Sequence, residues 1–183
     1  TFSFKITDKY KIDDLKINSS MNLKSSKIVS SKNLKEFFPE LNEIIDLSDH
    51  QIQIEYKNDL LSIIGNGNIL IQKEKDNIKY NFLKSKKNLI FDTSLEIKKN
   101  PFSLNFLNFK KDEVDKLEII ILGDKNLLSN EINLKNISIK EKNNKFQVKN
   151  LLLSKKYKIK SISKVNLDYF DNDLFKNELS IKK

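Results

Sequence analysis

The residue types that could perform chemistry are few and widely separated in this chain of 183 residues. The single histidine is His50, and cysteine is absent, which excludes a thiol nucleophile and a thiolate-ligated metal site. No G-x-S-x-G sequence supplies a serine that His50 could activate. We therefore expect His50 to be a solvated residue at the junction between two elements and not a catalytic base.

Three aspartates lie close together near the C-terminus, at Asp168, Asp171 and Asp173. The cluster resembles a calcium loop, but the D-x-D-x-D-G order and the closing glutamate of that loop are absent. We interpret the stretch as a turn and predict no metal ion and no organic cofactor. Because no set of residues combines a nucleophile, a base and oxyanion donors, the sequence predicts a protein that is not an enzyme.

Gly65 and Gly67 form a G-x-G motif within an apolar run, which raises the question of phosphate binding. A dinucleotide-binding loop requires a third glycine and a helix, whereas here the third position is Leu70 and residues 68–72 continue a strand. On one strand face, two missing side chains let the strand bend or let another group approach closely. A β-bulge without consequence for a ligand is the alternative. The apolar residues that share the parity of the glycines are Leu61, Ile63, Ile69 and Ile71.

The net charge of +9 invites a nucleic-acid hypothesis that the rest of the composition argues against. All 34 basic residues are lysine, and arginine, the residue favoured for bidentate contacts with phosphates and bases, is absent. The lysines are also spread among 25 acidic residues. We therefore predict no nucleic-acid partner. No apolar run is long enough to cross a bilayer, and a start at Thr1 favours an internal segment of a longer protein.

From His50 onward apolar and polar residues alternate, which is typical of β-strands. Polar turn signals such as KND (57–59) and SKKN (85–88) interrupt the alternation about every ten residues. This spacing predicts a mainly-β fold, a long twisted antiparallel meander that is curled into an open groove or a flattened barrel. Two further strands are expected at 2–6 and 10–23, the second with a bulge at Asp13–Asp14.

One segment, residues 32–46, departs from the alternation. Its apolar residues recur at helical spacing, Ser31 is a plausible N-cap, and Pro39 is placed to kink the helix. We predict a short helix over 32–46 that covers an open end or an edge of the sheet. The chain is then a single unit with a helix-containing part, 1–49, and a β-meander, 50–183. The residues of the helical pattern are Leu34, Phe37, Phe38, Leu41, Ile44 and Ile45.

Several expected strands are apolar on both faces, for example LEIIIL (117–122) and NLLLS (150–154), and the stretch NPFSLNFLNF (100–109) adds Phe102, Phe106 and Phe109. A two-layered sheet around a sealed core explains this pattern without any ligand. Alternatively, one face of the sheet stays uncovered, which is costly in water unless an apolar molecule such as an acyl chain occupies it.

The passage HQIQIEYKNDLLSIIGNGNILI (50–71) resembles a repeated element of the large bacterial AsmA-like proteins, the group that includes TamB and YhdP. The passage INLKNISIKEKNNKFQVKNLLLSKKYKIKSISKVNLDY (132–169) is similar to later repeats of that family. The resemblance covers roughly residues 30–183 and rests on the strand pattern with Gly65, Gly67 and Leu151 to Ser154 as anchors.

The resemblance implies an internal segment of a periplasmic envelope protein that is anchored in the inner membrane. Its strands would build a section of an elongated β-groove, continued by adjoining segments of the same chain, that carries phospholipid acyl chains between the inner and outer membranes without catalysis. In such a groove Gly65 and Gly67 would bend the strand. The residues that we expect to face acyl chains are Ile63, Ile69, Ile71, Phe91, Leu95, Phe102, Leu104 and Phe106.

Two other classes of function stay open at this point. A structural β-repeat scaffold of the cell envelope would have a sealed core and no ligand, so a face filled by the protein's own side chains would indicate it. A glycan-binding or glycan-processing protein would need exposed tryptophan or paired carboxylates, but tryptophan is absent and the carboxylates lie in expected turns.

Overall fold

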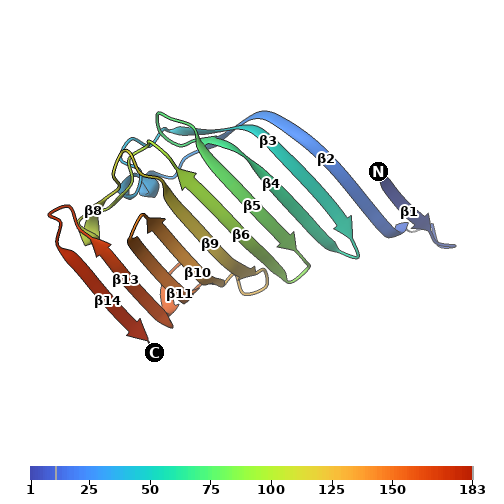
Figure 1. Ribbon diagram of the computed structural model, residues 1–183. Coiled ribbons are helices and arrows are strands. Elements are labelled where there is room, and N and C mark those ends of the chain that lie inside the picture. Colours follow the sequence, from blue (N-terminus) through green and yellow to red (C-terminus); the bar gives the residue numbers. More distant parts are fainter. Residues whose placement is uncertain (11, 183) are drawn as a thin grey trace.

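The computed structural model describes residues 1–10 and 12–182, which contain strands and two short 3-10 helices but no α-helix. Figure 1 shows most of the strands side by side along one long sheet, with the N- and C-terminal strands at its two edges, whereas β7 and β8 pair only with each other. The 3-10 helices are η1 (Lys32–Glu36) and η2 (Asn105–Leu107). The strands are β1 (Phe2–Ile6), β2 (Ile12–Val29), β3 (Ile44–Lys57), β4 (Leu60–Leu70), β5 (Asp76–Lys84), β6 (Asn88–Ile97), β7 (Ser103–Leu104), β8 (Phe109–Lys110), β9 (Leu117–Asn126), β10 (Ile132–Glu141), β11 (Asn144–Leu153), β12 (Ile159–Ser161), β13 (Lys164–Phe170) and β14 (Lys176–Lys182).

Within the described part of the chain, twelve strands form a single antiparallel sheet with the order β1-β2-β3-β4-β5-β6-β9-β10-β11-β13-β14, and β12 pairs with β11. The predicted long antiparallel meander is therefore confirmed. The predicted curling into a groove or a flattened barrel is wrong, because β1 and β14 lie far apart and the sheet stays open (Figure 1). Neighbouring strands pair in hairpin register with little stagger, whereas closure of a barrel requires a fixed stagger around the sheet.

The prediction of a helix over 32–46 is also wrong. Only η1 is helical, and β3 begins at Ile44, where it pairs with Val29 of β2. Pro39 has no N–H to donate and disfavours helical backbone at the residue before it, so a helix that includes Phe38 cannot continue. The apparent helical spacing reflects a segment that is buried on one side only. The coarser expectation that this segment covers one end of the sheet is correct, because Phe38 and Leu41 lie in the core.

The predicted bulge at Asp13–Asp14 is confirmed in β2. The pairing of β1 with β2 shifts register between Ser3 and Lys5, and Asp14 has a positive φ of 51°.

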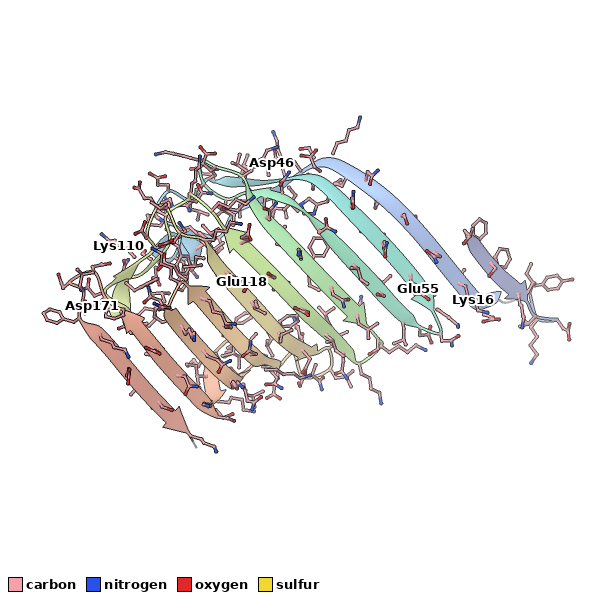
Figure 2. All side chains as sticks on the ribbon, in the orientation of Figure 1. Lys16, Asp46, Glu55, Lys110, Glu118 and Asp171 are labelled. Atoms are coloured by element: carbon pink, nitrogen blue, oxygen red, sulfur yellow. The ribbon has the colours of Figure 1, made fainter. Side chains whose placement is uncertain are left out.

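The two faces of the sheet differ sharply in polarity. Cross-strand pairing places a mainly apolar row on one face, which we call the apolar face, and a row made mostly of amides, hydroxyls and charges on the other, the polar face. Figure 2 shows nitrogen and oxygen atoms along the strands, where Glu55 and Glu118 mark the polar face. One row of the apolar face is Ile52, Gly65, Tyr80, Thr93, Ile121, Ile137, Val148, Val165 and Ile181. The adjacent row of the polar face is Gln51, Asn66, Lys79, Ser94, Ile120, Ser138, Gln147, Asn166 and Ser180.

The hydrophobic core lies at one end of the apolar face, which we call the capped end. There the connections 30–43 and 98–116 fold over the strands, and Ser103 donates its N–H to the carbonyl oxygen of Phe37 (3.0 Å). The ring of Phe109 packs edge-on against Phe146, with 4.8 Å between their centroids, and Tyr169 donates its hydroxyl to the carbonyl oxygen of Leu107 (3.0 Å). The buried apolar residues are Phe38, Leu41, Ile69, Ile71, Ile97, Phe102, Leu104, Phe109, Leu117, Phe146 and Tyr169.

Buried polar side chains attach the covering connections to the strand ends. Asn100 donates to the carbonyl oxygen of Glu74 (2.6 Å) and to the Asp76 carboxylate (2.7 Å), and Gln72 donates to the carbonyl oxygen of Pro101 (2.7 Å). Each of these contacts satisfies a buried polar group. The covering connections, 30–43 and 98–116, which we call the cap, are therefore held at a defined position on the sheet. Among residues 1–10 and 12–182, no helix is long and apolar enough to span a membrane.

Candidate functional site: the open face

His50 is fully buried, so the expectation of a solvated junction residue is wrong. The register of β3 shifts between Ser48 and Gln51, where Asp49 has a φ of 57°, and this bulge places the imidazole against Gly67. The Nε2–H of His50 donates to the carbonyl oxygen of Asn68 (2.9 Å), so Nδ1 accepts from the Tyr80 hydroxyl (3.2 Å). Both ring nitrogens are used within the protein, which leaves neither for a substrate.

Gly65 and Gly67 lie in the middle of β4 and accommodate bulky neighbours. A Cβ on Gly65 would overlap the ring of Tyr80, its cross-strand partner, and a Cβ on Gly67 would stand 2.8 Å from the Cα of His50. Neither glycine has a positive φ, so space and not backbone conformation requires them. The structure therefore shows a close approach of another group, one of the alternatives considered for these glycines, and no helix follows the motif that could receive a phosphate.

The aspartates near the C-terminus form a turn, as predicted. Asp171 accepts the backbone N–H groups of Asp173 (3.0 Å) and Phe175 (2.9 Å), whereas Asp168 belongs to β13. The described residues include no group of three histidine, aspartate or glutamate side chains arranged to hold a metal ion.

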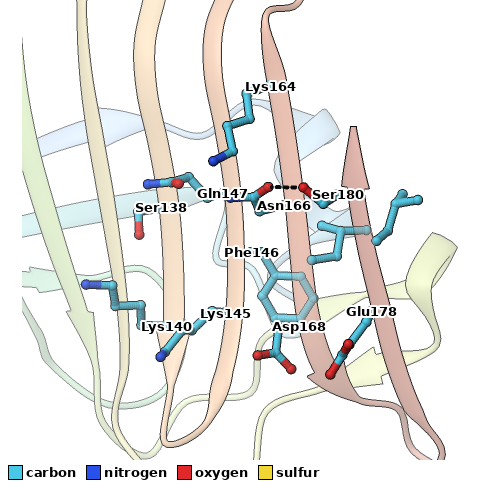
Figure 3. Close-up of a pocket in the computed structure, with 12 residues that line it drawn as sticks. Ser138, Lys140, Lys145, Phe146, Gln147, Lys164, Asn166, Asp168, Glu178 and Ser180 are labelled. Carbon is cyan, nitrogen blue, oxygen red and sulfur yellow. Dashed lines mark hydrogen bonds between the residues drawn. The ribbon is translucent and has the colours of Figure 1, made fainter. Parts of the chain in front are cut away.

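A depression of about 680 Å³ on the polar face lies over β10–β14 (Figure 3). Its lining includes Lys140, Lys145, Asp168 and Glu178, and both carboxylates are paired with Lys176. Every buried side-chain nitrogen and oxygen of the described residues has a hydrogen-bond partner. The depression is open, carries both signs of charge, and presents no group aimed at a ligand.

The part of the apolar face that lies outside the core is a surface for which the fold gives no structural reason. Outside the core, its side chains are only half-buried. We call this surface the open face, and the strand ends that border it the open end. Met21, Leu179 and Ile181, all close to half exposed, continue it onto β2 and β14. The open face consists of Ile52, Ile54, Tyr56, Leu61, Ile63, Phe82, Leu89, Phe91, Ile121, Ile132, Leu134, Ile137, Val148, Leu151, Leu153 and Val165.

The few polar atoms on the open face are bonded within the protein. The Thr93 hydroxyl donates to the carbonyl oxygen of Ile121 (3.4 Å), and the Tyr56 hydroxyl donates to Asp59 (3.1 Å). The Tyr80 hydroxyl is engaged with His50, as described above. The surface therefore offers an occupant apolar contact and almost no hydrogen bonding.

The eight residues predicted to face acyl chains fall into three groups. Ile63 and Phe91 lie on the open face, and Leu95 packs against the core from the same side of the sheet. Phe106 is 78% exposed in η2, away from the sheet rows. Side chains buried in the core cannot touch a molecule on the open face, so the candidate surface must be redefined without them. The four buried in the core are Ile69, Ile71, Phe102 and Leu104.

Most residues of the open face were not singled out from the sequence, although a signal for them exists. Ile52, Ile54, Phe82, Ile121 and Ile137 all belong to runs of period two. Strand parity alone says only that they share a face. Which part of that face the cap covers depends on contacts between distant segments, such as that of Ser103 with Phe37.

Comparison of the chain with protein-family models, with curated proteins and with solved structures gives no match. The AsmA-like assignment therefore has no support beyond the sequence pattern, and the structure supports a mainly-β antiparallel meander only.

Proposed function

We propose that the open face binds the acyl chains of phospholipids and that the protein is a passive, non-enzymatic hydrophobic conduit for them. The observation that carries the proposal is that the apolar face runs across the whole meander while the core covers only one end of it. Contiguous apolar patches larger than a few hundred Å² are rare on soluble proteins and usually mark an interaction site.

The dimensions of the open face suit an extended apolar occupant. Eleven strands lie in succession, and at about 4.8 Å per strand the sheet is roughly 50 Å long across the strands. This length exceeds what one acyl chain needs and allows several chains to lie side by side. Movement along the sheet would then exchange one apolar contact for another, with no barrier from broken hydrogen bonds.

The chemistry of the open face also favours acyl chains. A protein segment laid on this face would bring backbone N–H and C=O groups that need partners, and the face offers almost none. An acyl chain has no such groups and adapts its shape to a pleated surface.

The cellular setting of the proposal rests on the sequence resemblance. We place the chain in the periplasm as an internal segment of an AsmA-like envelope protein that is anchored in the inner membrane. Adjoining segments of the same parent chain would extend the sheet at β1 and β14, and phospholipid would pass between the inner and outer membranes.

The absence of cysteine permits a site-specific test of acyl binding. Single-cysteine variants Ile54→Cys and Glu55→Cys place a polarity-sensitive fluorophore on neighbouring positions of β3 that point to opposite faces. On titration with phospholipid below its aggregation threshold, the label at position 54 should shift to shorter emission wavelengths, and the label at position 55 should not.

Native mass spectrometry with lipid extraction gives a second readout on the unlabelled protein. Phospholipid should co-purify with the protein and be lost when Ile54, Phe91 and Ile137 are changed together to asparagine in a variant that still shows the β-sheet circular dichroism. A lipid-free protein that is nevertheless well folded would contradict the conduit and favour a structural scaffold.

A further inference from the structure

The two ends of the strands differ in charge. From β3 onward, four connections lie at the open end, namely 57–60, 84–88, 126–132 and 153–164, counted with the strand residues that flank them. They contain nine lysines and two acidic residues. The five connections at the capped end contain eleven lysines and eleven acidic residues, and they are 29–44, 70–76, 97–117, 141–144 and 170–176. Most of the chain's net charge of +9 is therefore gathered at one end of the sheet.

The two acidic residues of the open end are already neutralised. Asp59 pairs with Lys86 (2.7 Å) and Glu131 pairs with Lys160 (2.6 Å). No carboxylate among the described residues pairs with the other lysines of these connections, so their charges are available to an external anion. These lysines are Lys57, Lys84, Lys87, Lys155, Lys156, Lys158 and Lys164.

Two lysines lie at the border of the open face, on the same side of the sheet, in the last row before the turns. Lys84 is opposite Leu61 and Leu89, and Lys125 is opposite Leu89 and Ile132. Directly opposed residues of neighbouring strands share a face, so these ammonium groups border the apolar surface and not the polar one. Apolar and cationic side chains alternate along this row.

The distance from the core to this row fits the tail of a phospholipid. On β6 the distance from Leu95, which packs against the core, to Leu89 is about 20 Å of strand. One leaflet of a bilayer has about 15 Å of hydrocarbon, half of the 30 Å core. A lipid tail that reaches the cap would therefore place its phosphate at the level of Lys84 and Lys125.

We infer that Lys84 and Lys125, supported by the other lysines of the open-end connections, bind the phosphate of phospholipid headgroups. The tails of the same lipids lie on the open face and point toward the cap. Because the capped end has balanced charge, lipids bind in one orientation, and lipids with a net negative headgroup bind more tightly than neutral ones. The inference rests on the proposed function and adds to it the headgroup class and the orientation.

The test compares two double variants of equal charge change. Lys84→Gln/Lys125→Gln removes two charges at the open end, and Lys99→Gln/Lys110→Gln removes two exposed charges at the capped end. Affinities for phosphatidylglycerol, phosphatidylcholine and diacylglycerol, which has no phosphate, are measured with the fluorophore at Ile54→Cys. The open-end variant should lose affinity for phosphatidylglycerol on the order of tenfold, more than for phosphatidylcholine. Diacylglycerol binding should be unchanged, and the capped-end variant should behave like the unaltered protein.

The outcomes separate this inference from the proposed function. Two results would overturn the headgroup assignment alone. In the first, the protein binds diacylglycerol but has equal affinities for both phospholipids; in the second, the two double variants lose equal affinity for phosphatidylglycerol. Displacement of phosphatidylglycerol by inorganic phosphate at equal concentration would also overturn it, because the site would then recognise a free anion. Failure of all three lipids to bind the unaltered protein would overturn the proposed function, and the inference with it.

Discussion

The side chain of His50 fills the space next to the Cα of Gly67. The imidazole lies where a side chain of residue 67 would be. A Cβ at position 67 would also contact the Cα of His50, which cannot rotate away. At Gly65 the contact is with the far end of the Tyr80 ring, which can move. The two glycines of one motif therefore differ in how strictly they are required.

This difference predicts unequal effects of alanine. Gly67→Ala should destabilise the fold by about 1–3 kcal/mol, the range for overpacking a tight site. Gly65→Ala should cost less, because the ring of Tyr80 gives way. Urea unfolding of the two variants measures both values, and an equal or reversed order would contradict the assignment of the rigid contact to Gly67.

Asp76 makes the stability of the cap depend on pH. Burial raises the pKa of its carboxyl above the ordinary 3.8, although hydrogen bonds from the Lys98 amide and Asn100 oppose the shift. Because the folded-state pKa is the higher one, the stability that this group contributes is complete below pH 3.8 and is lost as pH rises through the folded pKa.

We therefore expect the unaltered protein to lose stability relative to Asp76→Asn as pH rises from below 3.8 toward neutrality. Urea unfolding of both proteins across this range gives the difference, and Asp92→Asn, at an exposed position of the polar face, is the control. A difference that stays constant with pH would exclude a raised pKa at Asp76.

At the scale of elements, the cap and the sheet meet through a few aromatic side chains. Phe109 packs against Phe146 and Tyr169 and is only 2% exposed, whereas Phe106, three residues earlier, is 78% exposed. Phe109→Ala should therefore cost about 3–5 kcal/mol of unfolding free energy, and Phe106→Ala within about 0.5 kcal/mol. Thermal or urea unfolding checks the pair. Similar losses in both variants would mean that η2 is covered in solution.

The strands were predictable from the sequence because burial on one face leaves a period of two. Ile52, Ile54 and Tyr56 show this period plainly. The turn that follows them is marked by Asn58 and Asp59, both of positive φ. The false helix at 32–46 shows the limit of such patterns, because a coil segment buried on one side can imitate a helical period. Pro39 was the signal against that helix.

The site could be predicted only in part. Alternation identifies a set of residues that share a face, but the burial of Ile69, Phe102 and Leu104 in the core results from contacts more than sixty residues apart in sequence, such as Ser103 with Phe37. His50 shows the same limit, because its burial depends on a bulge and on the absence of a side chain at Gly67.

At the scale of the whole molecule, the sheet has two edges at which backbone groups have no partner strand among the described residues. β1 is the more exposed edge, with Phe2 and Phe4 at 72% and 44% exposure and their rings stacked 6.1 Å apart. An exposed apolar edge is a template for pairing with another strand.

The isolated protein should therefore self-associate through β1. Phe4→Lys should reduce this association by adding a charge at the edge, and Phe106→Lys, at a more exposed phenylalanine away from the edge, should not. Sedimentation velocity over a range of protein concentrations compares the three proteins. Equal association in all of them would place the contact elsewhere.

The uneven charge of the two strand ends has a consequence before any contact is made. A body with its positive charge displaced from its centre is an electric dipole, and the field near an anionic bilayer exerts a torque on it. The protein would rotate so that the lysine-rich turns lead and the cap trails. The field acts only within a Debye length, about 8 Å at physiological ionic strength, so added salt would let the molecule arrive in any orientation.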